Sequence, residues 1–415
     1  MTTHTRTRYA SIAAVVPGVL LLAVIGLGCN EEPPASLFDP NYVSGPTPVI
    51  SAITPASGLG GVTVMTVAGL NFSTVPAYNQ VVFRPRGDVE GTLLGTVLQA
   101  SATSLEVKAP ILAGDTIEVR VAVQGADLYS DPIFCSLASA QLEWGAFSQS
   151  DAPAGIACDV AGNVYFSNLY TGSADSVYTI SPDNVQTPYS PAFSSQVPRW
   201  TGMKVGPGGS IYCVGGRNII FEIPAGGGTV ALWQRGGIGN VLDLDFDQPG
   251  NVWTAGTGTA VYSVTPAKTV TTFAIEQTSI RTIRVFGGYL YYGGTRGSDE
   301  GVWRRQILAA DNLGAEELYF DYSAVYAEGF VNAITFAADG DMYVGTDGPE
   351  GIVVVHAGGA SEAFYPGIVE PASVAFAWGA GTELFVSRAG GTAKATVLRI
   401  EMQKQGAPTY GRLLP

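Results

Sequence analysis

Few residues in this chain are of a type and spacing that could carry acid–base or metal chemistry. The sequence has two histidines, and only His356 lies beyond the N-terminal leader described below. Zinc sites need several histidine or cysteine ligands and a Ser-His-Asp triad needs a free histidine, so neither is expected. Cys135, Cys158 and Cys213 lack the close spacing of a metal knot; Cys158 and Cys213 either pair with each other or remain free thiols.

Three turns place aspartate or asparagine beside glycine, as calcium loops do. They are 159–163, 247–251 and 338–341. A calcium-binding hand would show alternating acidic residues followed by a bidentate glutamate, and these turns do not. Asp and Asn cap tight turns through their own side chains, and glycine supplies the positive φ. We therefore interpret the three segments as structural turns. We expect no cofactor, although calcium binding stays open as an alternative.

A short sequence motif typical of a β-strand recurs six times between about residues 153 and 402. The strands that it predicts would position these residues. The copies lie at 162–166, 209–213, 250–254, 288–292, 340–344 and 381–385. A spacing of roughly 40 residues is the period of one propeller blade. Residues 140–147 have the form of an outer strand and precede the array. We expect this segment to close the ring by pairing in the last blade, or else residues 407–413 to do so.

A separate pattern precedes the repeats. Alternating apolar residues, a Pro-Gly turn and a second alternating strand over 49–72 predict the start of a small β-sandwich. The elements Ile-x-x-Ile-x-Pro-x-x-Gly and Gly-Gly-x-x-Val-x-Val-x-Gly-x-Asn-Phe resemble the IPT/TIG family of immunoglobulin-like domains. The resemblance covers about residues 48–137 and implies a spacer module.

The repeat region, 138–405, resembles the NHL-repeat and gluconolactonase-like six-bladed propellers. This resemblance implies a divalent cation at the channel mouth, held by a Glu and by Asn or Asp residues at the starts of inner strands. The corresponding positions here are Ala154, Thr201, Leu242 or Asp243, Arg281, Asn332 and Ala372. Only Asn332 and Asp243 have oxygen ligands of the expected kind, and no Glu stands in the first blade. A metal-dependent lactonase therefore loses most of its support.

Ligands of a propeller usually bind on the face formed by the more variable loops. Arginine, carboxylate and aromatic side chains in these loops suit a sugar, a peptide or another protein. The loop at 293–300 and the segment 321–330 are the least turn-like. The candidate ligand-binding residues are Arg199, Trp200, Arg281, Arg296, Asp299, Glu328, Asn332, Asp347 and Arg388.

The N-terminus has the pattern of a bacterial export signal. A short cationic stretch and an apolar run end at Cys29, after which the sequence turns polar at once. The pattern resembles a lipobox, although Gly26 stands where Leu is usual, so Cys29 is the expected lipidation site. We predict a signal peptide over 1–28, a flexible tether over 29–47 and a C-terminal tail over 406–415.

The composition bears on which classes of partner the protein could bind. The formal net charge is −14 without a basic stripe, which argues against nucleic acid as a partner. The sequence predicts an all-β, lipid-anchored envelope protein of the outer membrane, the periplasm or the cell surface, whose propeller binds a protein or glycan and meets the membrane only through its lipid. The shortage of catalytic groups favours a binding protein over an enzyme. The alternative is a hydrolase or lactonase of a small sugar-derived substrate, with or without calcium.

Overall fold

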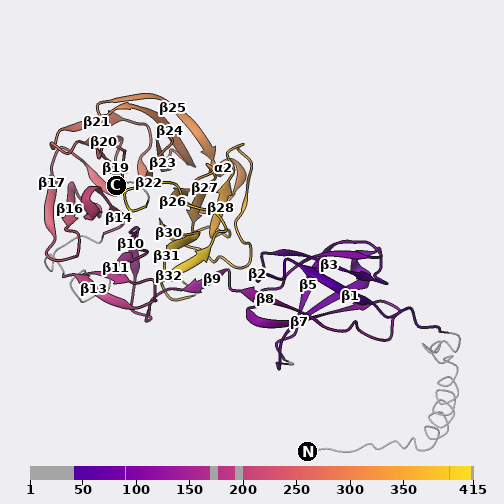
Figure 1. Cartoon of the computed structure of the whole chain (residues 1–415). Coiled ribbons are helices and arrows are strands. Elements are labelled where there is room, and N and C mark those ends of the chain that lie inside the picture. Colours follow the sequence, from indigo (N-terminus) through magenta and orange to yellow (C-terminus); the bar gives the residue numbers. More distant parts are fainter. Residues whose placement is uncertain (1–41, 89, 169–175, 192–199, 392, 413–415) are drawn as a thin grey trace, which may run out of the picture.

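A computed structural model describes residues 42–88, 90–168, 176–191, 200–391 and 393–412 (Figure 1). The predicted signal peptide, Cys29 and Arg199 lie outside these residues. No helix among the described residues has the length and hydrophobicity needed to cross a bilayer.

The first part of the chain is a β-sandwich, as the sequence predicts. Its strands follow the order β1-β3-β6-β5-β4-β7-β8-β2. Alternation of side chains along each strand buries one face, and Val81, Phe83 and Val119 are among the fully buried residues of this core. The strands are β1 (Val49–Thr54), β2 (Ser57–Leu59), β3 (Val64–Leu70), β4 (Asn79–Pro85), β5 (Leu93–Ala100), β6 (Ser104–Lys108), β7 (Gly114–Val123) and β8 (Ile133–Ala138), with a 3₁₀ turn, η1, at Pro76–Tyr78.

The second part is a β-propeller, in which antiparallel sheets stand around a centre (Figure 1). The predicted repeats are its sheets. The first two are β10 (Pro153–Cys158), β11 (Val164–Asn168), β12 (Ser176–Ile180), β13 (Gln186–Ser190), then β14 (Gly202–Val205), η2 (Pro207–Gly209), β15 (Ile211–Val214), β16 (Ile219–Ile223) and β17 (Ala231–Arg235).

The middle of the ring is one larger sheet in which two groups of four strands meet at a single residue pair, Thr257 with Ser279. The first group is β18 (Asn240–Phe246), β19 (Val252–Thr257), β20 (Ala260–Val264) and β21 (Val270–Ala274). The second is β22 (Ser279–Phe286), β23 (Tyr289–Arg296), β24 (Asp299–Ala309) and β25 (Asn312–Asp321), followed by a short helix, α2 (Tyr322–Val325).

The last two sheets bring the chain back to its start. They contain β26 (Val331–Phe336), β27 (Met342–Thr346), β28 (Ile352–Val355), β29 (Ser361–Ala363), then β30 (Ser373–Trp378), β31 (Glu383–Arg388), β32 (Thr396–Glu401) and β9 (Gln141–Glu143). Strand β9 pairs antiparallel with β32, with Leu142 opposite Arg399. Phe166 of the first sheet and Phe385 of the last lie in one buried cluster, so packing as well as pairing holds the two ends of the ring together.

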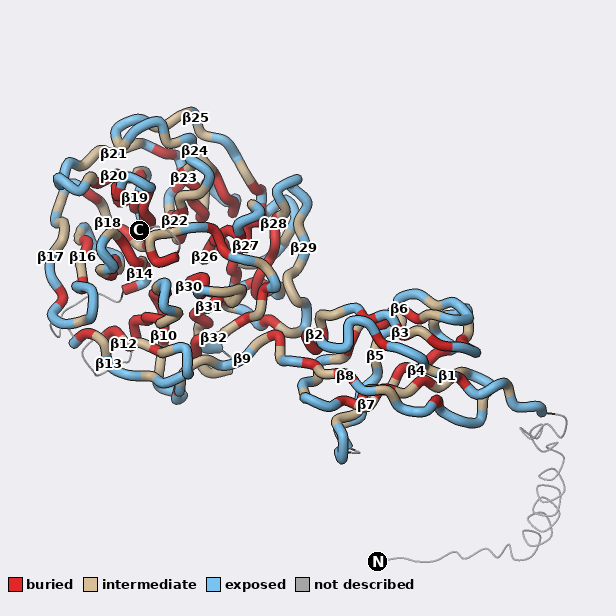
Figure 2. The backbone as a smooth tube through the Cα atoms, in the orientation of Figure 1, coloured by how far each residue is buried: buried red, intermediate tan, exposed pale blue. Residues whose placement is uncertain are grey.

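The cores of the propeller lie between neighbouring sheets, and the outer strands are the exposed ones (Figure 2). The turns after the inner strands repeat one piece of local chemistry. Asp247 accepts hydrogen bonds from the backbone N–H of Asn251 at 2.8 Å and from the indole of Trp253 at 2.9 Å. Gly250 has a φ of 87°, which a residue with a side chain rarely adopts. Asp159 and Asn163 form the same turn, in which the backbone N–H and the side-chain amide of Asn163 each donate to Asp159 at 2.9 Å.

The sandwich and the propeller lie close together at Gly61. This residue has a φ of 75°, and a Cβ there would lie 2.8 Å from the side chain of Ile368 in the propeller. Strand β8 ends at Ala138 and β9 begins at Gln141, so the connection between the two domains is also short. A side chain at position 61 is thus disfavoured both by the positive φ and by the contact with Ile368.

Candidate functional site

The centre of the propeller opens at one end into a cavity of about 170 Å³. Its lining residues come from the beginnings of the inner strands, one from each repeat: Ala154, Thr201, Leu242, Arg281, Asn332 and Val374. We call this cavity the mouth. Because each repeat contributes the same place on its inner strand, the six side chains meet although they are spread over more than 200 residues of sequence.

A β-bulge explains why these side chains turn toward the mouth. The register of the inner strands shifts around Leu242, Arg281, Asn332 and Val374, and a further shift in β10 spans Ala154. A bulge adds one residue to a strand and redirects its side chain. The mouth is therefore lined largely by bulge residues, which the regular alternation of a strand would have placed elsewhere.

Arg281 is held rigidly in the mouth. Its Nε donates to the carbonyl of Val331 at 2.9 Å, its Nη1 donates to the hydroxyl of Thr295 at 3.0 Å, and its Nη2 forms an ion pair with Glu300. The guanidinium also lies 5.1 Å from the ring centre of Phe330. Three of the five N–H groups of the guanidinium are therefore engaged within the protein.

Glu300 is only 5% exposed and links Arg281 to the next repeat, because it also accepts the backbone N–H of Val331 at 3.1 Å. The segment 321–330 borders this pair. Its Phe330 donates a backbone N–H to Asp347 at 2.7 Å, and the hydroxyl of Tyr322 donates to the carbonyl of Glu328 at 2.9 Å. The loop that the sequence marked as unusual therefore supports the arginine of the mouth.

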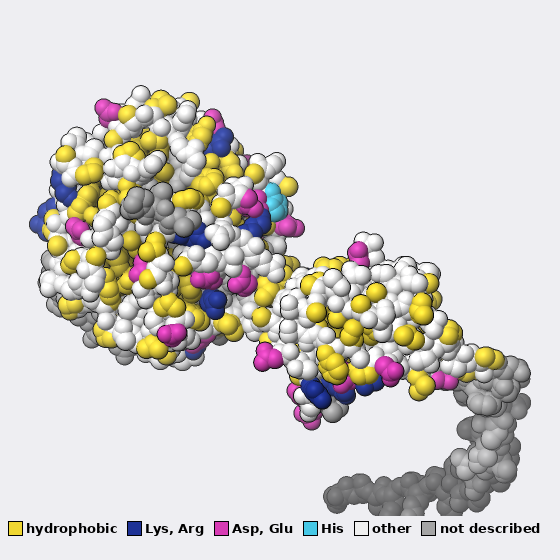
Figure 3. Space-filling model, in the orientation of Figure 1, with side chains coloured by type: hydrophobic (Ala, Val, Ile, Leu, Met, Phe, Trp, Pro, Cys, Tyr) yellow, Lys and Arg dark blue, Asp and Glu magenta, His cyan; other side chains and the backbone are white. Residues whose placement is uncertain are grey.

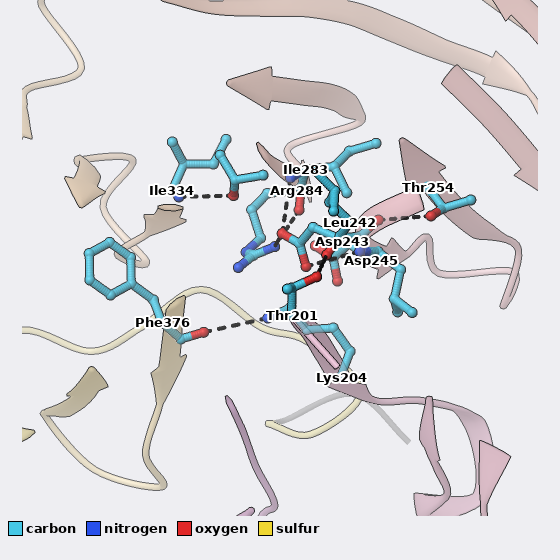
Figure 4. Close-up of polar contacts among 12 residues, drawn as sticks. Thr201, Lys204, Leu242, Asp243, Asp245, Thr254, Ile283, Arg284, Ile334 and Phe376 are labelled. Atoms are coloured by element: carbon cyan, nitrogen blue, oxygen red, sulfur yellow. Dashed lines mark hydrogen bonds and ion pairs between the residues drawn. The ribbon is translucent and has the colours of Figure 1, made fainter. Parts of the chain in front are cut away.

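Below the mouth, four charged side chains fill the channel (Figure 4). Asp243 binds Nη1 of Arg284 at 2.6 Å and accepts the backbone N–H of Ile283 at 3.1 Å. Asp245 accepts the backbone N–H of Val285 at 2.9 Å, and desolvation raises its pKa. The ammonium of Lys204 donates to the carbonyl of Phe376 at 3.4 Å.

Lys204 is the least well paired member of this group. Burial, assisted by the nearby charge of Arg284, lowers its pKa to about 8, although Asp243 and Asp245 act in the opposite direction. A cavity of about 50 Å³ lies beside it, lined also by Cys158, Thr335 and residues of the C-terminal tail. The channel therefore contains two cations and two carboxylates in a confined space.

The C-terminal tail covers the end of the channel opposite the mouth. Arg412 is 2% exposed and donates to the carbonyls of Gly379 at 2.7 Å, Gly406 at 2.9 Å and Gly381 at 2.7 Å. Gly406 forms a bridge with Ala337, just after β26. Residues 406–412 of the tail thus lie at the ends of inner strands and form no outer strand, whereas the mouth lies at the beginnings of the inner strands.

Two of the predicted ligand-binding residues do not lie on an exposed loop surface. Trp200 is fully buried and packs against Phe221, because it belongs to the core beneath its loop. Arg388 is 7% exposed and is engaged by Glu370 and by the carbonyl of Lys394 at 2.9 Å, so it fixes a connection within the last sheet.

The structure brings Arg281 and Asn332 together in the mouth and places the other candidates around it or away from it. Glu328 and Asp347 are exposed near its rim. Arg296 stacks on Trp303 at 4.9 Å and is paired with Glu316 on the outer hairpin, where Asp299 is also exposed. The sequence predicted that the starts of the inner strands line the mouth. It gave no sign of the bulges that turn Leu242 and Val374 toward it.

The mouth does not fit the cation implied by the propeller resemblance. Calcium takes six to eight oxygen ligands, whereas the mouth offers the amide of Asn332, the hydroxyl of Thr201 and a guanidinium. The carboxylate of Asp243 is already engaged by Arg284 and by backbone N–H groups. Within the described residues, no group of three His, Cys, Asp or Glu side chains could hold a metal ion.

The histidine and the cysteines have structural surroundings. His356 is 40% exposed at its side chain, and its Nδ1 lies 3.1 Å from Asp341, which also binds Lys404. Cys135, Cys158 and Cys213 are all buried and free, so Cys158 and Cys213 do not pair. Burial raises the pKa of the Cys135 thiol to about 11, which opposes nucleophilic reactivity.

Comparison with known proteins defines the family of the first domain. Residues 48–135 match the IPT/TIG domain family. No curated protein matches the chain. Similar solved structures include a luciferin-regenerating enzyme, at 15% identity and a TM-score of 0.49, covering 65% of this chain and 96% of that one.

Two bacterial structures are similar to a comparable degree. A calcium-binding protein, regucalcin, from Agrobacterium tumefaciens has 14% identity and a TM-score of 0.47, covering 63% of this chain and 95% of its own. Virginiamycin B lyase from Staphylococcus aureus has 14% identity and a TM-score of 0.45, and the match covers 70% of this chain and 93% of the lyase. Values this low say nothing about a ligand, and the description of the fold rests on the strand pairing.

Proposed function

We propose that this protein is a lipid-anchored component of the bacterial envelope whose propeller binds a glycan through the mouth, with the IPT/TIG domain as spacer. The observation that carries the proposal is the fixed guanidinium of Arg281 beside the half-buried amide of Asn332 in a cavity of about 170 Å³. The anchor rests on the leader and on Cys29 in the sequence. We also infer six blades, counting the larger sheet as two blades joined by one residue pair.

A sugar suits the mouth better than an extended protein surface does. Arg281, Asn332 and Thr201 supply hydrogen-bonding groups, whereas Leu242 and Val374 supply apolar contacts. Small-ligand sites combine apolar walls with a few convergent polar groups in this way. A stable protein interface needs roughly 800 Å² per partner, which a cavity of this size would supply only in part.

The alternative, a hydrolase or lactonase of a small sugar-derived substrate, has weaker support. It needs a general base or a metal-bound water near the substrate. The two carboxylates nearest the mouth already have partners, because Glu300 is paired with Arg281 and Asp243 with Arg284. The donor set of the mouth favours holding a ligand over reacting with it.

The test uses protein that begins at Ser44, applied to an array of neutral and acidic oligosaccharides with calcium and with a chelator. We expect binding to at least one neutral glycan, unaffected by the chelator. Asn332→Trp should abolish it, because an indole would fill the mouth, and Asn332→Ala should weaken it about 10-fold through lost hydrogen bonds. Asn312→Ala, on an exposed outer strand, is the matched control. Unchanged binding by Asn332→Trp would overturn the proposal, and strict dependence on calcium would favour the alternative.

A further inference from the structure

The sandwich has a polar outer face distinct from the mouth. In β4 and β7 the buried residues alternate with half-exposed ones, so Val82, Arg84, Glu118 and Arg120 lie on the side away from the core. The pairing register places Arg84 opposite Glu118 and Val82 opposite Arg120. These four side chains are therefore immediate neighbours across two strands.

This face forms a hollow of about 470 Å³, larger than the mouth. Gln80 and Leu94 line it on one side and Tyr129 on the other, and the last two are 57% and 53% exposed. On the face of the sandwich shown in Figure 3, the visible basic side chains gather along one edge. We call this hollow the arginine groove.

The two arginines of the groove converge on one carboxylate. Arg84 Nη2 lies 2.8 Å from Oε1 of Glu118, and Nε of Arg120 binds the same oxygen. Arg120 Nη1 also donates to the carbonyl of Ser130 at 3.4 Å. These bonds use three of the ten N–H groups of the two guanidinium groups, so seven make no bond among those described here. The side chains of Arg84 and Arg120 are 33% and 37% exposed.

The net charge of the groove suits a ligand that places one singly charged group in it. Two arginines and one glutamate give a net charge of +1, within a chain whose formal charge is −14. Hydrogen bonds from Arg120 and Arg84 lower the pKa of Glu118, which keeps this carboxylate ionised. A carboxylate ligand would neutralise the groove, and guanidinium groups bind carboxylates in planar, two-bonded geometry. A doubly charged phosphate would leave an excess of negative charge.

We propose that the arginine groove binds an acidic polysaccharide built from uronic acids, with one carboxylate across Arg84 and Arg120 and a sugar ring against Tyr129. The open shape suits a chain that passes through, and amphipathic tyrosine rings suit sugar faces. The IPT/TIG domain is then a second binding module in addition to its role as a spacer.

The test is calorimetric titration of protein beginning at Ser44 with oligogalacturonate and with its fully methyl-esterified form, which has the same rings without the charge. We expect saturable binding of the acid that weakens as salt rises, and at least about 10-fold weaker binding of the ester. Arg84→Gln with Arg120→Gln should lose about 10-fold or more, and Tyr129→Ala should lose several-fold. Arg84→Lys with Arg120→Lys keeps the charge but lacks the planar fork, so it should show an intermediate affinity.

Two controls separate this groove from general electrostatics and from the mouth. Arg304→Gln removes an arginine that is 28% exposed and paired with Glu317 at 2.8 Å in the propeller, and it should leave the affinity unchanged. Asn332→Trp should also leave it unchanged. Each variant is accepted only if its thermal unfolding matches that of the wild type. Wild-type protein without saturable binding, equal affinity for acid and ester, or loss of binding in Asn332→Trp alone would each overturn the proposal.

Discussion

Lys204 in the channel allows the energetic cost of a buried charge to be measured. Its ammonium has the carbonyl of Phe376 as a hydrogen-bond acceptor at 3.4 Å and is surrounded by Asp243, Asp245 and Arg284. We predict that Lys204→Met stabilises the propeller at neutral pH. Methionine has a similar length and flexibility but no charge to desolvate.

The size of the effect follows from the lowered pKa. The lowering of the Lys204 pKa from 10.5 to about 8 corresponds to roughly 3 kcal/mol. Because the pKa is lower in the folded state, the unfolded chain binds more protons between pH 8 and 10.5, so stability rises with pH in this window. Below pH 8 the full cost is present. Met would remove it, but Asp245 would lose a favourable neighbour, so we expect a net gain of about 1–3 kcal/mol at pH 7.

Urea unfolding followed by tryptophan fluorescence measures this effect in the propeller alone, because all six tryptophans lie between Trp144 and Trp378. The stability advantage of Lys204→Met should be largest at pH 7 and shrink by pH 10. Lys204→Arg, which keeps a charge at every pH, should lack the gain in stability that the wild type shows on raising the pH. A constant difference between wild type and Lys204→Met across this range would refute the assigned titration, and a destabilised Lys204→Met at pH 7 would show that the charge is favourable.

Two further predictions concern buried groups. Arg412→Gln should destabilise the propeller by about 2–4 kcal/mol in the same assay, because carbonyl groups that now accept from the guanidinium would lose their donors; a change below 0.5 kcal/mol would contradict this. Cys135, Cys158 and Cys213 should react with a thiol reagent only after unfolding, giving three thiols per chain that starts at Ser44, and rapid labelling of the folded protein would disprove their burial.

The fold was largely predictable because its signals are local. Alternation within each strand, the Gly-Asn turns and the repeat period all act over a few tens of residues. The turn around Asp247 illustrates this, since the aspartate, the glycine and the asparagine that form it lie within five residues. The IPT/TIG pattern over 48–135 is local in the same sense.

The details of the site depend on tertiary structure and were less predictable. Trp200 is an aromatic residue beside a loop, a type that often contacts ligands. Whether such a side chain faces solvent or the core depends on the neighbouring sheet, and here Trp200 packs against Phe221. Arg388 is likewise removed from the surface by Glu370, which is 18 residues away. The course of the tail across the channel depends on Arg412 reaching three backbone carbonyls, and no periodic pattern encodes that.

The bulges connect the repeats to the diversity of the mouth. A regular inner strand must place apolar residues between sheets, so substitution there would disturb the core. A bulge residue is left outside this alternation, and its side chain can change from Val374 to Asn332 or Arg281 while the flanking strand stays the same. Arg281 is balanced by the carboxylate of Glu300 and the hydroxyl of Thr295, both on the adjacent hairpin. The side chains that line the mouth are therefore set by single positions at which the repeats differ.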